Sequence, residues 1–575
     1  MKRLAARPRD SPESGPAIEA ADLDSRGVIA REAALDALSS DTFDLVVVGG
    51  GITGAGVALD AAARGYSVAL VEKADYAAGT SSRSSKLVHG GLRYLQNFDL
   101  GLVREALLER QLLVTLAPHL VRPLRLVVPA FESARPDRLV GVGLNLYDVM
   151  SVDKLRGRLR RRDDDSSWSP DRHRVITGEE VVELLPALAG RQPTSGYLFY
   201  DCQTDDVRLV FTVLGEAERF GAVMANRVEV TDLVPEGVRA VDRESGDDFV
   251  IRAANVVNAT GVWADRLRPD ELHNEAEVPT IRPSRGTHVT VSSEAVPLVA
   301  GAIVPAGGGR SIFALPWLGR TLLGTTDNDY EGDLDHIPAD PADVDYILDA
   351  ANAFFGRDLT PDEITGAYAG VRPLISTGDP KKSVDISRKA ELYETSSGMI
   401  TITGGKLTTF RRMAKMAVDR LVEREARDAP CRTHEIPLGL PVDPDDLRRV
   451  EGVPDDSYRA LAARYGFAAH DVLRVAAERG ELAQPVVDGL PDLLAEVAFA
   501  ARREQALTVG DVLLRRTRLG LLAARELDDG PARRVAAALG AERGWDGPRI
   551  EAEVDRWRAE STAEGLVVRT ETRPQ

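Results

Sequence analysis

Three glycines and one acid have the spacing of a dinucleotide-binding site. Gly49, Gly51 and Gly54 fill the glycine positions of G-x-G-x-x-G, and Glu72 follows about 20 residues later. The first glycine permits a sharp turn, the second lets the backbone approach a pyrophosphate, and the third lets a helix pack close to a strand. The acid can accept hydrogen bonds from ribose hydroxyls and would repel a 2′-phosphate. The pattern therefore predicts FAD or NAD as the ligand and disfavours NADP.

A loop rich in small and hydroxylated residues follows this acid. Residues 76–95 read YAAGTSSRSSKLVHGGLRYL. Backbone N–H groups and short hydroxyls in such a loop can approach a phosphate or a flavin ring. A solvated serine-rich linker is the alternative, but the loop runs directly into an apolar, helix-like stretch that lacks proline. The residues of this loop that could contact ligands are Thr80, Ser81, Ser82, Ser85, Lys86, His89, Arg93 and Tyr94.

Two later turns also consist of small residues whose backbone can approach a bound cofactor. Ala259, Thr260 and Gly261 follow the strand-like run that ends at Val257, and Gly404–Gly405 precede a helix that begins near Thr408. The N-terminus of such a helix can stabilise negative charge on a bound group, and Lys406 projects from the same turn. Two separated segments that embrace one extended dinucleotide are typical of flavoproteins. We therefore favour FAD over NAD.

The elements that must position these residues follow from the hydrophobic pattern. Residues 43–48 are an apolar, β-branched run typical of a buried strand, a helix that carries Val57, Leu59, Ala62 and Ala63 ends at Gly65, and residues 68–71 form a second strand. Residues 280–330 contain several strand-like runs separated by turn residues, with a hairpin turn at Gly307–Gly309. This pattern indicates an antiparallel sheet. Residues 455–565 have apolar residues at helical spacing. The expected fold class is α/β, a Rossmann-like FAD-binding domain with an inserted antiparallel β-sheet substrate domain and a C-terminal all-α domain.

These patterns divide the chain into four parts. We expect a disordered or partly helical tail before the first strand and a helical domain after a proline-rich linker. The FAD-binding and substrate domains are each discontinuous in sequence. The expected bounds are 1–41 for the tail, 42–117, 200–270 and 366–425 for the FAD-binding domain, 118–199 and 271–365 for the substrate domain, and 440–565 for the helical domain.

Composition limits the classes of function. The chain has 575 residues and a net charge of −18, which argues against general nucleic-acid binding. Cys202 and Cys431 are its two cysteines, so no disulfide framework or cysteine metal cluster is expected, and no metal site is proposed. The N-terminus has no hydrophobic core of a secretory signal, and no apolar run approaches the length of a membrane span. These features suit a cytoplasmic enzyme.

The loop GTSSRSSKLVHGGLRYL resembles the FAD-dependent glycerol-3-phosphate dehydrogenases, within the wider family that includes glycine oxidase and D-amino-acid oxidase. Further matching motifs are RGTHV around His288, the GTTD turn at 324–327, DISR at Arg388 and GGKLTTF at 404–410. The resemblance covers about residues 42–425. The remaining match is a D-x-x-x-D-D-x-R-L run, made by Asp201, Asp205, Asp206, Arg208 and Leu209.

The resemblance implies a substrate, a reaction and site residues. It implies hydride transfer from C2 of glycerol 3-phosphate to FAD, with dihydroxyacetone phosphate as product, and it places the strand at Val228 against the adenine. His288 and His89 are the candidate bases, with His288 favoured, because imidazole titrates near the working pH. The residues expected to bind the substrate and act on it are Arg93, Tyr94, Arg372, Arg388 and Lys406. The same resemblance extends the cofactor contacts to Ala259, Thr260, Gly261, Gly405, Lys406, Leu407 and Thr408.

In the family a membrane quinone reoxidises the flavin. We therefore expect an enzyme held peripherally on the inner face of the cytoplasmic membrane, with a homodimer as an open alternative to a monomer. The basic run at residues 154–165 follows the apolar residues 139–150, and each basic residue near anionic lipid contributes about 1 kcal/mol. A solvated surface segment with partly cancelling charges is an equally good interpretation.

Other functions remain open at this point. A flavin oxidase of the same fold would pass electrons to oxygen and release peroxide, acting on glycerol 3-phosphate, an amino acid or a 2-hydroxy acid. A flavin-binding subunit of a larger complex and a plain NAD dehydrogenase are two further alternatives. We expect Asp205 and Asp206 to form an ion-paired turn that caps a helix. Arg515, Arg516 and Arg518 form either a docking feature or a plain polar helix face, and we favour the polar face.

Overall fold

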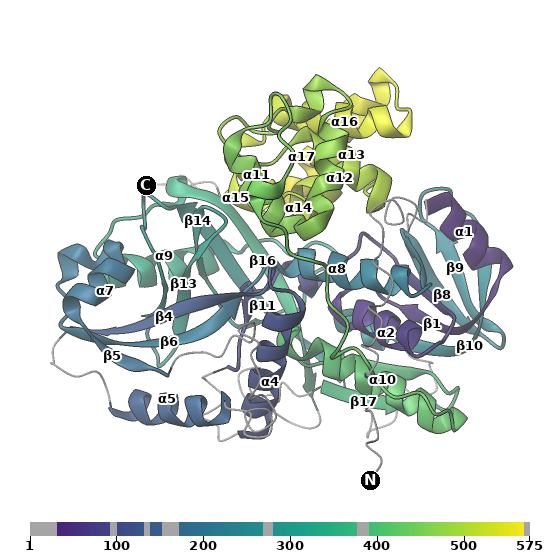
Figure 1. The fold of residues 1–575 in the computed structure, drawn as a ribbon, viewed down its shortest axis with the longest axis horizontal. Helices are drawn as coiled ribbons and strands as arrows, with labels where there is room; N and C mark the ends of the chain where they lie inside the picture. The colour runs from purple at the N-terminus through teal and green to yellow at the C-terminus, as the bar shows by residue number, and fades with distance from the viewer. Residues whose placement is uncertain are drawn as a thin grey trace, which may run out of the picture.

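The computed structural model describes residues 31–91, 100–131, 138–151, 172–267, 280–376 and 390–568. Two sheet-containing domains lie side by side, and a helical domain is seated above both of them (Figure 1). The expected fold class is confirmed: a nucleotide-binding α/β domain, a largely antiparallel sheet domain and a C-terminal all-α domain.

The first sheet is built around the predicted strand–turn–helix–strand unit. β1 (Thr42–Val48) and β2 (Val68–Glu72) are parallel neighbours, and α2 (Ile52–Ala63) connects them. Helix α2 packs against α8 (Asp206–Arg219) and α10 (Phe410–Glu425), while α1 (Arg31–Ser40) contacts β7 and β10. The strand order is β17 (Ala390–Glu394), β18 (Ile400–Gly404), β10 (Asp248–Asn258), β1, β2 and β7 (Val223–Asn226), with β9 (Gly237–Asp242) beside β10 and β8 (Val228–Val234) beside β9.

The second sheet carries the longest strand pair. β11 (Thr280–Ser292) and β16 (Ile364–Ser376) run antiparallel over nearly their full length. Its path is β15 (Asn328–Asp329), β11, β14 (Arg320–Gly324), β13 (Ser311–Trp317), β12 (Gly301–Pro305), β4 (Arg122–Ala130), β6 (Ser195–Gln203) and β3 (Leu87–Val88), with β16 beside β11 and β5 (Arg174–Thr177) beside β6. The helices of this part are α4 (Leu100–Leu116), α5 (Arg138–Ser151), α7 (Gly178–Leu184) and α9 (Pro341–Phe355).

The pairing of β16 corrects one predicted assignment. The sequence pattern predicts residues 366–376 in the nucleotide-binding domain, whereas this strand is hydrogen-bonded to β11 in the second sheet. Strand β6 likewise crosses the expected boundary at residue 200. Strand pairing is set by contacts far along the chain, which local pattern does not record.

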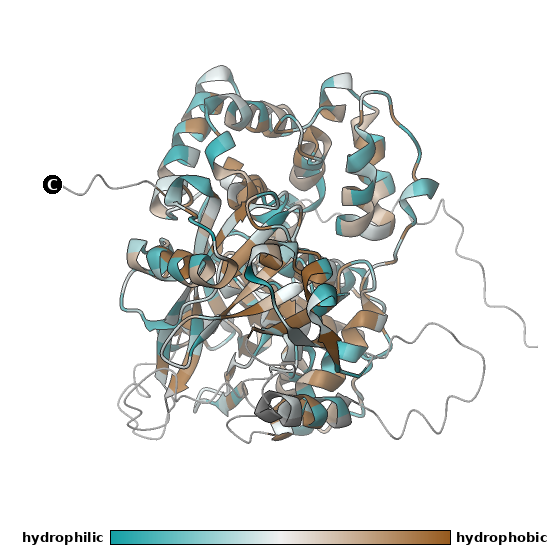
Figure 2. Ribbon diagram, turned by 90° about the vertical axis from the view of Figure 1, so that its left-hand side faces the viewer, coloured by the Kyte–Doolittle hydropathy of each residue, from teal (hydrophilic) through white to brown (hydrophobic). Residues whose placement is uncertain are grey.

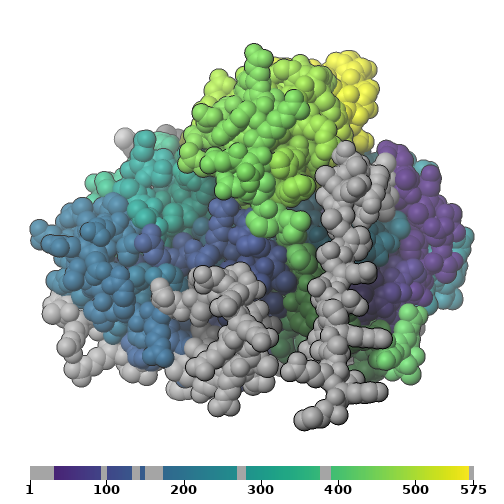
Figure 3. All heavy atoms as spheres, viewed as in Figure 1, coloured from purple at the N-terminus to yellow at the C-terminus, as the bar shows by residue number. Residues whose placement is uncertain are grey.

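The helical domain spans both sheet domains. Its helices form one continuous mass across the top of the molecule (Figure 3). A shared apolar core runs through it, with Leu461, Val497 and Leu539 fully buried. Its helices are α11 (Asp455–Tyr465), α12 (Ala469–Ala476), α13 (Leu494–Arg503), α14 (Val509–Arg515), α15 (Leu519–Leu522), α16 (Asp529–Arg543) and α17 (Gly547–Ala563).

Three arginines of this domain are buried, contrary to expectation. Arg516 and Arg518 are fully buried and Arg515 nearly so. Arg518 pairs with Asp205, which also caps α8 by accepting a hydrogen bond from the Arg208 backbone N–H. The predicted ion-paired capping turn is therefore confirmed. The predicted polar helix face is wrong, because acids supplied by the first 210 residues neutralise these arginines inside the molecule.

Apolar residues concentrate on the central strands. Leu45, Val46 and Val47 of β1 are fully buried, as expected of a parallel strand covered on both faces. Brown, hydrophobic ribbon accordingly dominates the interior in Figure 2. Within the described ranges, none of the helices is both long and apolar enough to cross a bilayer.

Candidate active site

A cavity of about 970 Å³ lies where the three domains meet. This volume is at the upper end of the range for small-molecule sites, as an extended dinucleotide requires. Its wall combines the ends of β1 and β2 and the turn after β10 with β11, β16 and helix α17. The predicted site residues that line it are Gly49, Gly51, Glu72, Thr80, Ser81, Ser85, His89, Val228, Ala259, Thr260, Gly261, His288, Arg372, Gly405, Lys406, Leu407 and Thr408.

The glycine turn forms the floor of this cavity. Gly49 has φ +112°, which disfavours any residue with a Cβ, and a Cβ there would lie 2.7 Å from the carbonyl oxygen of Ala259. A Cβ on Gly54 would overlap the carbonyl oxygen of Gly49. Gly54 is not among the residues that line the cavity; it lets the first turn of α2 pack against the glycine turn. The two glycine-bearing turns touch each other, so a ligand laid over one also meets the other.

Glu72 ends β2 at the edge of the cavity. Its carboxylate accepts hydrogen bonds from the backbone N–H groups of Gly50 at 2.7 Å and Ala74 at 2.9 Å. Burial raises the pKa of this carboxyl above its ordinary value. The two bonds fix the carboxylate where an acid of this fold meets a ribose.

The hydroxyl-rich loop connects the two sheets. Ser81 Oγ accepts a hydrogen bond from the Ile52 N–H at the start of α2, at 2.9 Å. Thr80 donates its hydroxyl to the carbonyl oxygen of Val371 on β16, at 2.5 Å. The loop thus holds the first turn of α2 and the second sheet in one arrangement.

Lys86 and Ser82 lie behind the cavity wall, not on it. The ammonium of Lys86 is completely buried and bonds both carboxylate oxygens of Asp206 at 2.9 Å and the Ser82 carbonyl at 2.7 Å. Burial lowers the pKa of Lys86. The predicted role in contacting the cofactor does not fit this geometry; Lys86 instead holds the loop to the start of α8.

His288 is a buried imidazole on β11. It is 2% exposed, and its ring stacks on Tyr368 of β16 at 4.8 Å with an interplanar angle of 10°. Its Nε2 is 2.9 Å from the Ser85 hydroxyl. Burial, and then the positive charges of Arg372 and Lys86, hold the pKa of His288 well below its ordinary value. This shift favours the unprotonated ring, the form that a general base requires.

Arg372 places a guanidinium in the same cavity. It lies on β16, opposite Ser284 of β11, and its side chain is 23% exposed. Its terminal nitrogens donate to Asp327 Oδ1, Thr325 Oγ1 and the Thr326 carbonyl, each at 3.2 Å. These bonds orient the fork that guanidinium offers to a phosphate or carboxylate.

His89 and Lys406 come from two other segments of the wall. The His89 backbone N–H donates to Thr408 Oγ1 at 3.0 Å, which ties the loop after β3 to the turn before α10. The His89 ring meets Phe313 edge to face. Both candidate bases thus line one cavity, together with two of the four predicted cations. Arg93, Tyr94 and Arg388 lie outside the described residues.

Several lining residues were not anticipated from sequence. Arg83 lies within the hydroxyl-rich loop and Trp263 just after the Ala259–Gly261 turn, so the neighbouring motifs could have identified both. The ammonium of Lys73 lies 4.4 Å from the Trp263 ring centroid. Arg515 and Glu560 come from the helical domain, for which no sequence signal pointed to the site.

Two family descriptions match the chain. Residues 44–420 match the FAD dependent oxidoreductase family, and residues 400–550 match the C-terminal domain of alpha-glycerophosphate oxidase. The first match alone covers more than half of the chain.

Three proteins that resemble this chain over most of their length are named glycerol-3-phosphate dehydrogenases. Glycerol-3-phosphate dehydrogenase 2 of Mycobacterium tuberculosis (strain ATCC 25618 / H37Rv) is 37% identical over 577 aligned positions, covering 98% of this chain and 94% of the relative. The glycerol-3-phosphate dehydrogenase of Synechocystis sp. is 34% identical, covering 84% and 90%. The X-ray structure of the glycerol-3-phosphate dehydrogenase from Bacillus halodurans complexed with FAD aligns with a TM-score of 0.74 at 29% identity, covering 94% of this chain and 99% of that one.

Proposed function

This chain belongs to the family of FAD-dependent oxidoreductases that contains the glycerol-3-phosphate dehydrogenases, and on that premise we propose that it oxidises sn-glycerol 3-phosphate to dihydroxyacetone phosphate. Its cofactor is FAD. The residues present fit this group, because the Gly49 and Gly51 backbone leaves room for a pyrophosphate and Glu72 is fixed beside it. When bound, FAD supplies the acceptor for the hydride that leaves C2 of the substrate.

The observation that carries the proposal is the pairing of His288 and Arg372 on adjacent strands. One is a neutral imidazole and the other a fixed cation, and both line the cavity that holds the glycine turn. A secondary alcohol with a phosphate needs both groups: a base for its hydroxyl proton and a cation for its phosphate.

Arg372 binds the phosphate in this scheme. Its fork is held in place by the 325–327 turn, so little side-chain freedom is lost when the substrate binds. Lys406, from the turn before α10, adds a second positive charge to the lining of the same cavity. These two cations attract an anionic substrate in a protein that is acidic as a whole.

His288 takes the hydroxyl proton as C2 loses its hydride. Stacking on Tyr368 and the hydrogen bond with Ser85 fix the plane of the ring. Because the imidazole is neutral, it can accept this proton without first losing one. His89 is the second candidate for this role, since it lines the same cavity.

We further propose a membrane quinone as the electron acceptor and a peripheral position on the inner face of the cytoplasmic membrane. Exposed Leu100 on α4 and Leu146 on α5 support such contact, and these two helices pack together at the lower edge in Figure 1. The basic run at 154–165 follows α5 in sequence and lies outside the described residues. The homodimer also stays a prediction, which sedimentation velocity would check.

Turnover of the purified chain tests this function. With a soluble quinone analogue or an artificial electron acceptor, glycerol 3-phosphate should be oxidised, whereas amino acids and 2-hydroxy acids should not. Stoichiometric peroxide in the presence of oxygen and the absence of quinone reduction would identify an oxidase instead. Inactivity of the isolated chain with every acceptor would favour a subunit whose partner completes the site.

A further inference from the structure

One face of the last helix forms part of the cavity wall. Four residues of α17 at positions i, i+3, i+4 and i+7 line the cavity: Arg556, Ala559, Glu560 and Ala563. Glu564 follows the helix, lines the same cavity and pairs with Arg83 of the hydroxyl-rich loop. The C-terminal domain therefore reaches the site through a continuous helical surface.

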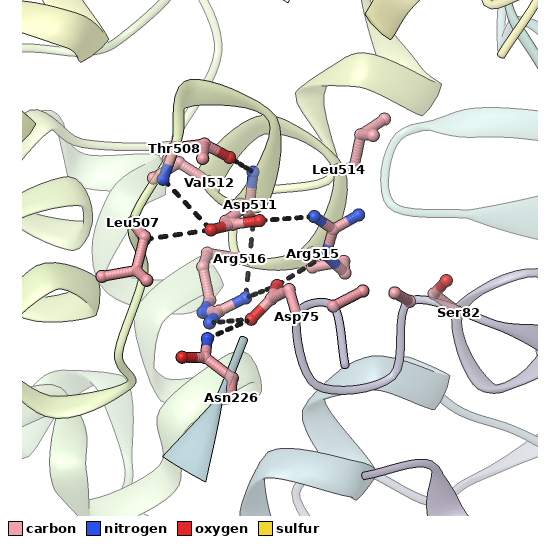
Figure 4. Close-up of polar contacts among 12 residues, drawn as sticks. Asp75, Ser82, Asn226, Leu507, Thr508, Asp511, Val512, Leu514, Arg515 and Arg516 are labelled. Atoms are coloured by element: carbon pink, nitrogen blue, oxygen red, sulfur yellow. Dashed lines mark hydrogen bonds and ion pairs between the residues drawn. The ribbon is translucent and has the colours of Figure 1, made fainter. Parts of the chain in front are cut away.

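Buried ion pairs anchor this surface to the nucleotide-binding domain. Asp75 accepts hydrogen bonds from Arg515 Nε at 2.5 Å and from two Arg516 nitrogens at 2.6 and 2.9 Å (Figure 4). Asp75 and Arg516 are fully buried. Arg515, which also lines the cavity, bonds Asp511 at 2.6 Å. A charge cluster of this kind is stable only when every partner is in place, because an unpaired buried charge costs about 3–5 kcal/mol.

The anchor lies next to the residues expected to hold the adenosine. Asp75 follows Glu72 by three positions, in the loop whose Ala74 N–H is bonded to the Glu72 carboxylate. Arg227, which directly precedes Val228, donates to Asp511 of α14 at 2.7 Å. The Asn226 amide donates to the Gln505 carbonyl at 2.8 Å. Both nucleotide-domain segments at this end of the cavity are thus tied to the helical domain.

Glu560 is the acidic residue that α17 contributes to the lining of the cavity. Its carboxyl group packs directly against Gly510, where a Cβ would overlap it. Burial raises its pKa, and the charge of Arg515 opposes this shift. A carboxyl in this position can hydrogen-bond ribose hydroxyls or adenine nitrogens.

We propose that the C-terminal helical domain is a structural part of the FAD site: α17 and Arg515 close the adenosine end of the cavity, so that FAD binding and docking of this domain stabilise each other. The coupling is reciprocal by thermodynamic linkage, since whatever binds only the docked form also favours docking. The inference depends on FAD as the cofactor and not on glycerol 3-phosphate as the substrate. Its tests therefore measure amide exchange and FAD release, and they stay informative if the substrate proposal fails.

Hydrogen exchange of the full-length chain is the first test. The flavin-free protein is compared with the same protein saturated with FAD. We expect FAD to slow amide exchange at least 10-fold in α14 and α17 as well as in residues 44–54, with α9 of the second sheet domain unchanged as the internal control. Protection confined to the nucleotide-binding segments, with equal exchange in α14 and α17, would overturn the proposal.

A matched pair of substitutions on α17 is the second test, and it uses the holoenzyme. Ala559 and Ala552 are both exposed, but Ala559 lines the cavity and Ala552, two turns earlier, does not. Ala559→Glu places bulk and negative charge against an anionic cofactor, so FAD release after dilution, followed by flavin fluorescence, should be at least 10-fold faster. Ala552→Glu should release FAD at the wild-type rate. Equal release rates in both variants would contradict the assignment of this wall to the FAD site.

Discussion

His288 and Arg372 give the cavity a neutral base and a fixed cation on neighbouring strands. Their chemistry depends on one another, because the guanidinium charge helps to keep the imidazole unprotonated. Ser85 and Tyr368 fix the ring, and the 325–327 turn fixes the guanidinium. At the scale of single residues, the site is a pair of preoriented groups with separate tasks.

Replacing Arg372 should weaken binding of the phosphate. In Arg372→Met we expect the KM for glycerol 3-phosphate to rise by about 10- to 100-fold, because a hydrogen bond to a charged group contributes about 1.5–3 kcal/mol. Steady-state kinetics with an artificial acceptor measures this change. Glycerol, which has no phosphate, serves as the control substrate: its kcat/KM should change little. An equal loss for both substrates would assign Arg372 a structural role.

Replacing His288 should abolish proton transfer and leave FAD bound. We expect kcat of His288→Asn to fall by about 100- to 10,000-fold, the usual contribution of a general base. Flavin content by absorbance is the control. If His89→Asn shows this loss and His288→Asn does not, the base is His89.

The pH profile gives an independent check on His288. Its pKa lies well below 6.5, so the neutral form persists as the pH falls from 8 through 6.5, and kcat/KM should stay level over that interval. The decline should begin only at lower pH, where the imidazole becomes protonated. The phosphate of the substrate titrates at about pH 6, so the matching profile of kcat, which reports the enzyme–substrate complex, is the deciding one: a kcat that is half-maximal at pH 6.5 or above would contradict His288 as the base.

The placement of single residues could be predicted where the signal is local. The glycine turn and Ser81 lie at the cavity, as expected from the motifs that carry them, and their contact with FAD stays a prediction. Lys86, Arg515 and Arg516 were misjudged for the opposite reason. Asp75 is 440 positions from Arg515, and nothing in a helical Arg-rich stretch distinguishes a buried cluster from a solvated face.

At the scale of elements, the start of α2 is the most constrained junction. Gly49 needs a positive φ, and Gly54 must lack a side chain because the turn passes directly over it. The strand, the turn and the helix are therefore specified together by three glycines. The same spacing made this unit predictable from sequence.

A matched pair of glycine substitutions tests this constraint. In Gly54→Ala the new methyl would overlap the Gly49 carbonyl, so we expect a lower melting temperature and loss of FAD. Gly215→Ala is the control: Gly215 lies inside α8, where a Cβ meets nothing within 4 Å, and the substitution should stabilise the protein by about 1 kcal/mol. Thermal unfolding and flavin content measure both. Unchanged FAD binding in Gly54→Ala would refute the close approach.

Elements paired over long distances were predicted less well. β16 was assigned to the nucleotide-binding domain, although it completes the second sheet beside β11 and carries Arg372 into the cavity. The sequence of β16 predicts an extended strand, but it does not indicate the strand with which β16 pairs. The expected hairpins at 301–324 did form, because short turns fix the pairing of consecutive strands.

At the scale of the whole molecule, three domains meet at one cavity. The first sheet supplies the nucleotide floor, the second supplies His288 and Arg372, and the helical domain supplies α17 and Arg515. Sequence pattern predicted that the three domains exist. It did not predict that the helical domain touches the site, because that contact rests on ion pairs between distant segments.

Breaking the interdomain cluster should destabilise the whole chain. In Arg516→Met, Asp75 keeps Arg515 but loses its bidentate partner, and we expect unfolding to become easier by about 3 kcal/mol. Chemical denaturation of the holoenzyme measures this change. Arg533→Met is the control, since Arg533 forms an exposed pair with Glu551 that water and salt screen, so its loss should leave the stability nearly unchanged. Equal stability of the two variants would show that the buried cluster does not hold the domains together.

Anaerobic mixing of the purified holoenzyme with glycerol 3-phosphate tests the central claim most directly. We expect the flavin absorbance at about 450 nm to bleach within the time of one turnover, without any added acceptor. Bleaching should require both the phosphate and the secondary alcohol, so glycerol and inorganic phosphate together should have no comparable effect. A flavin that stays oxidised with glycerol 3-phosphate would contradict the assignment of this cavity to that reaction.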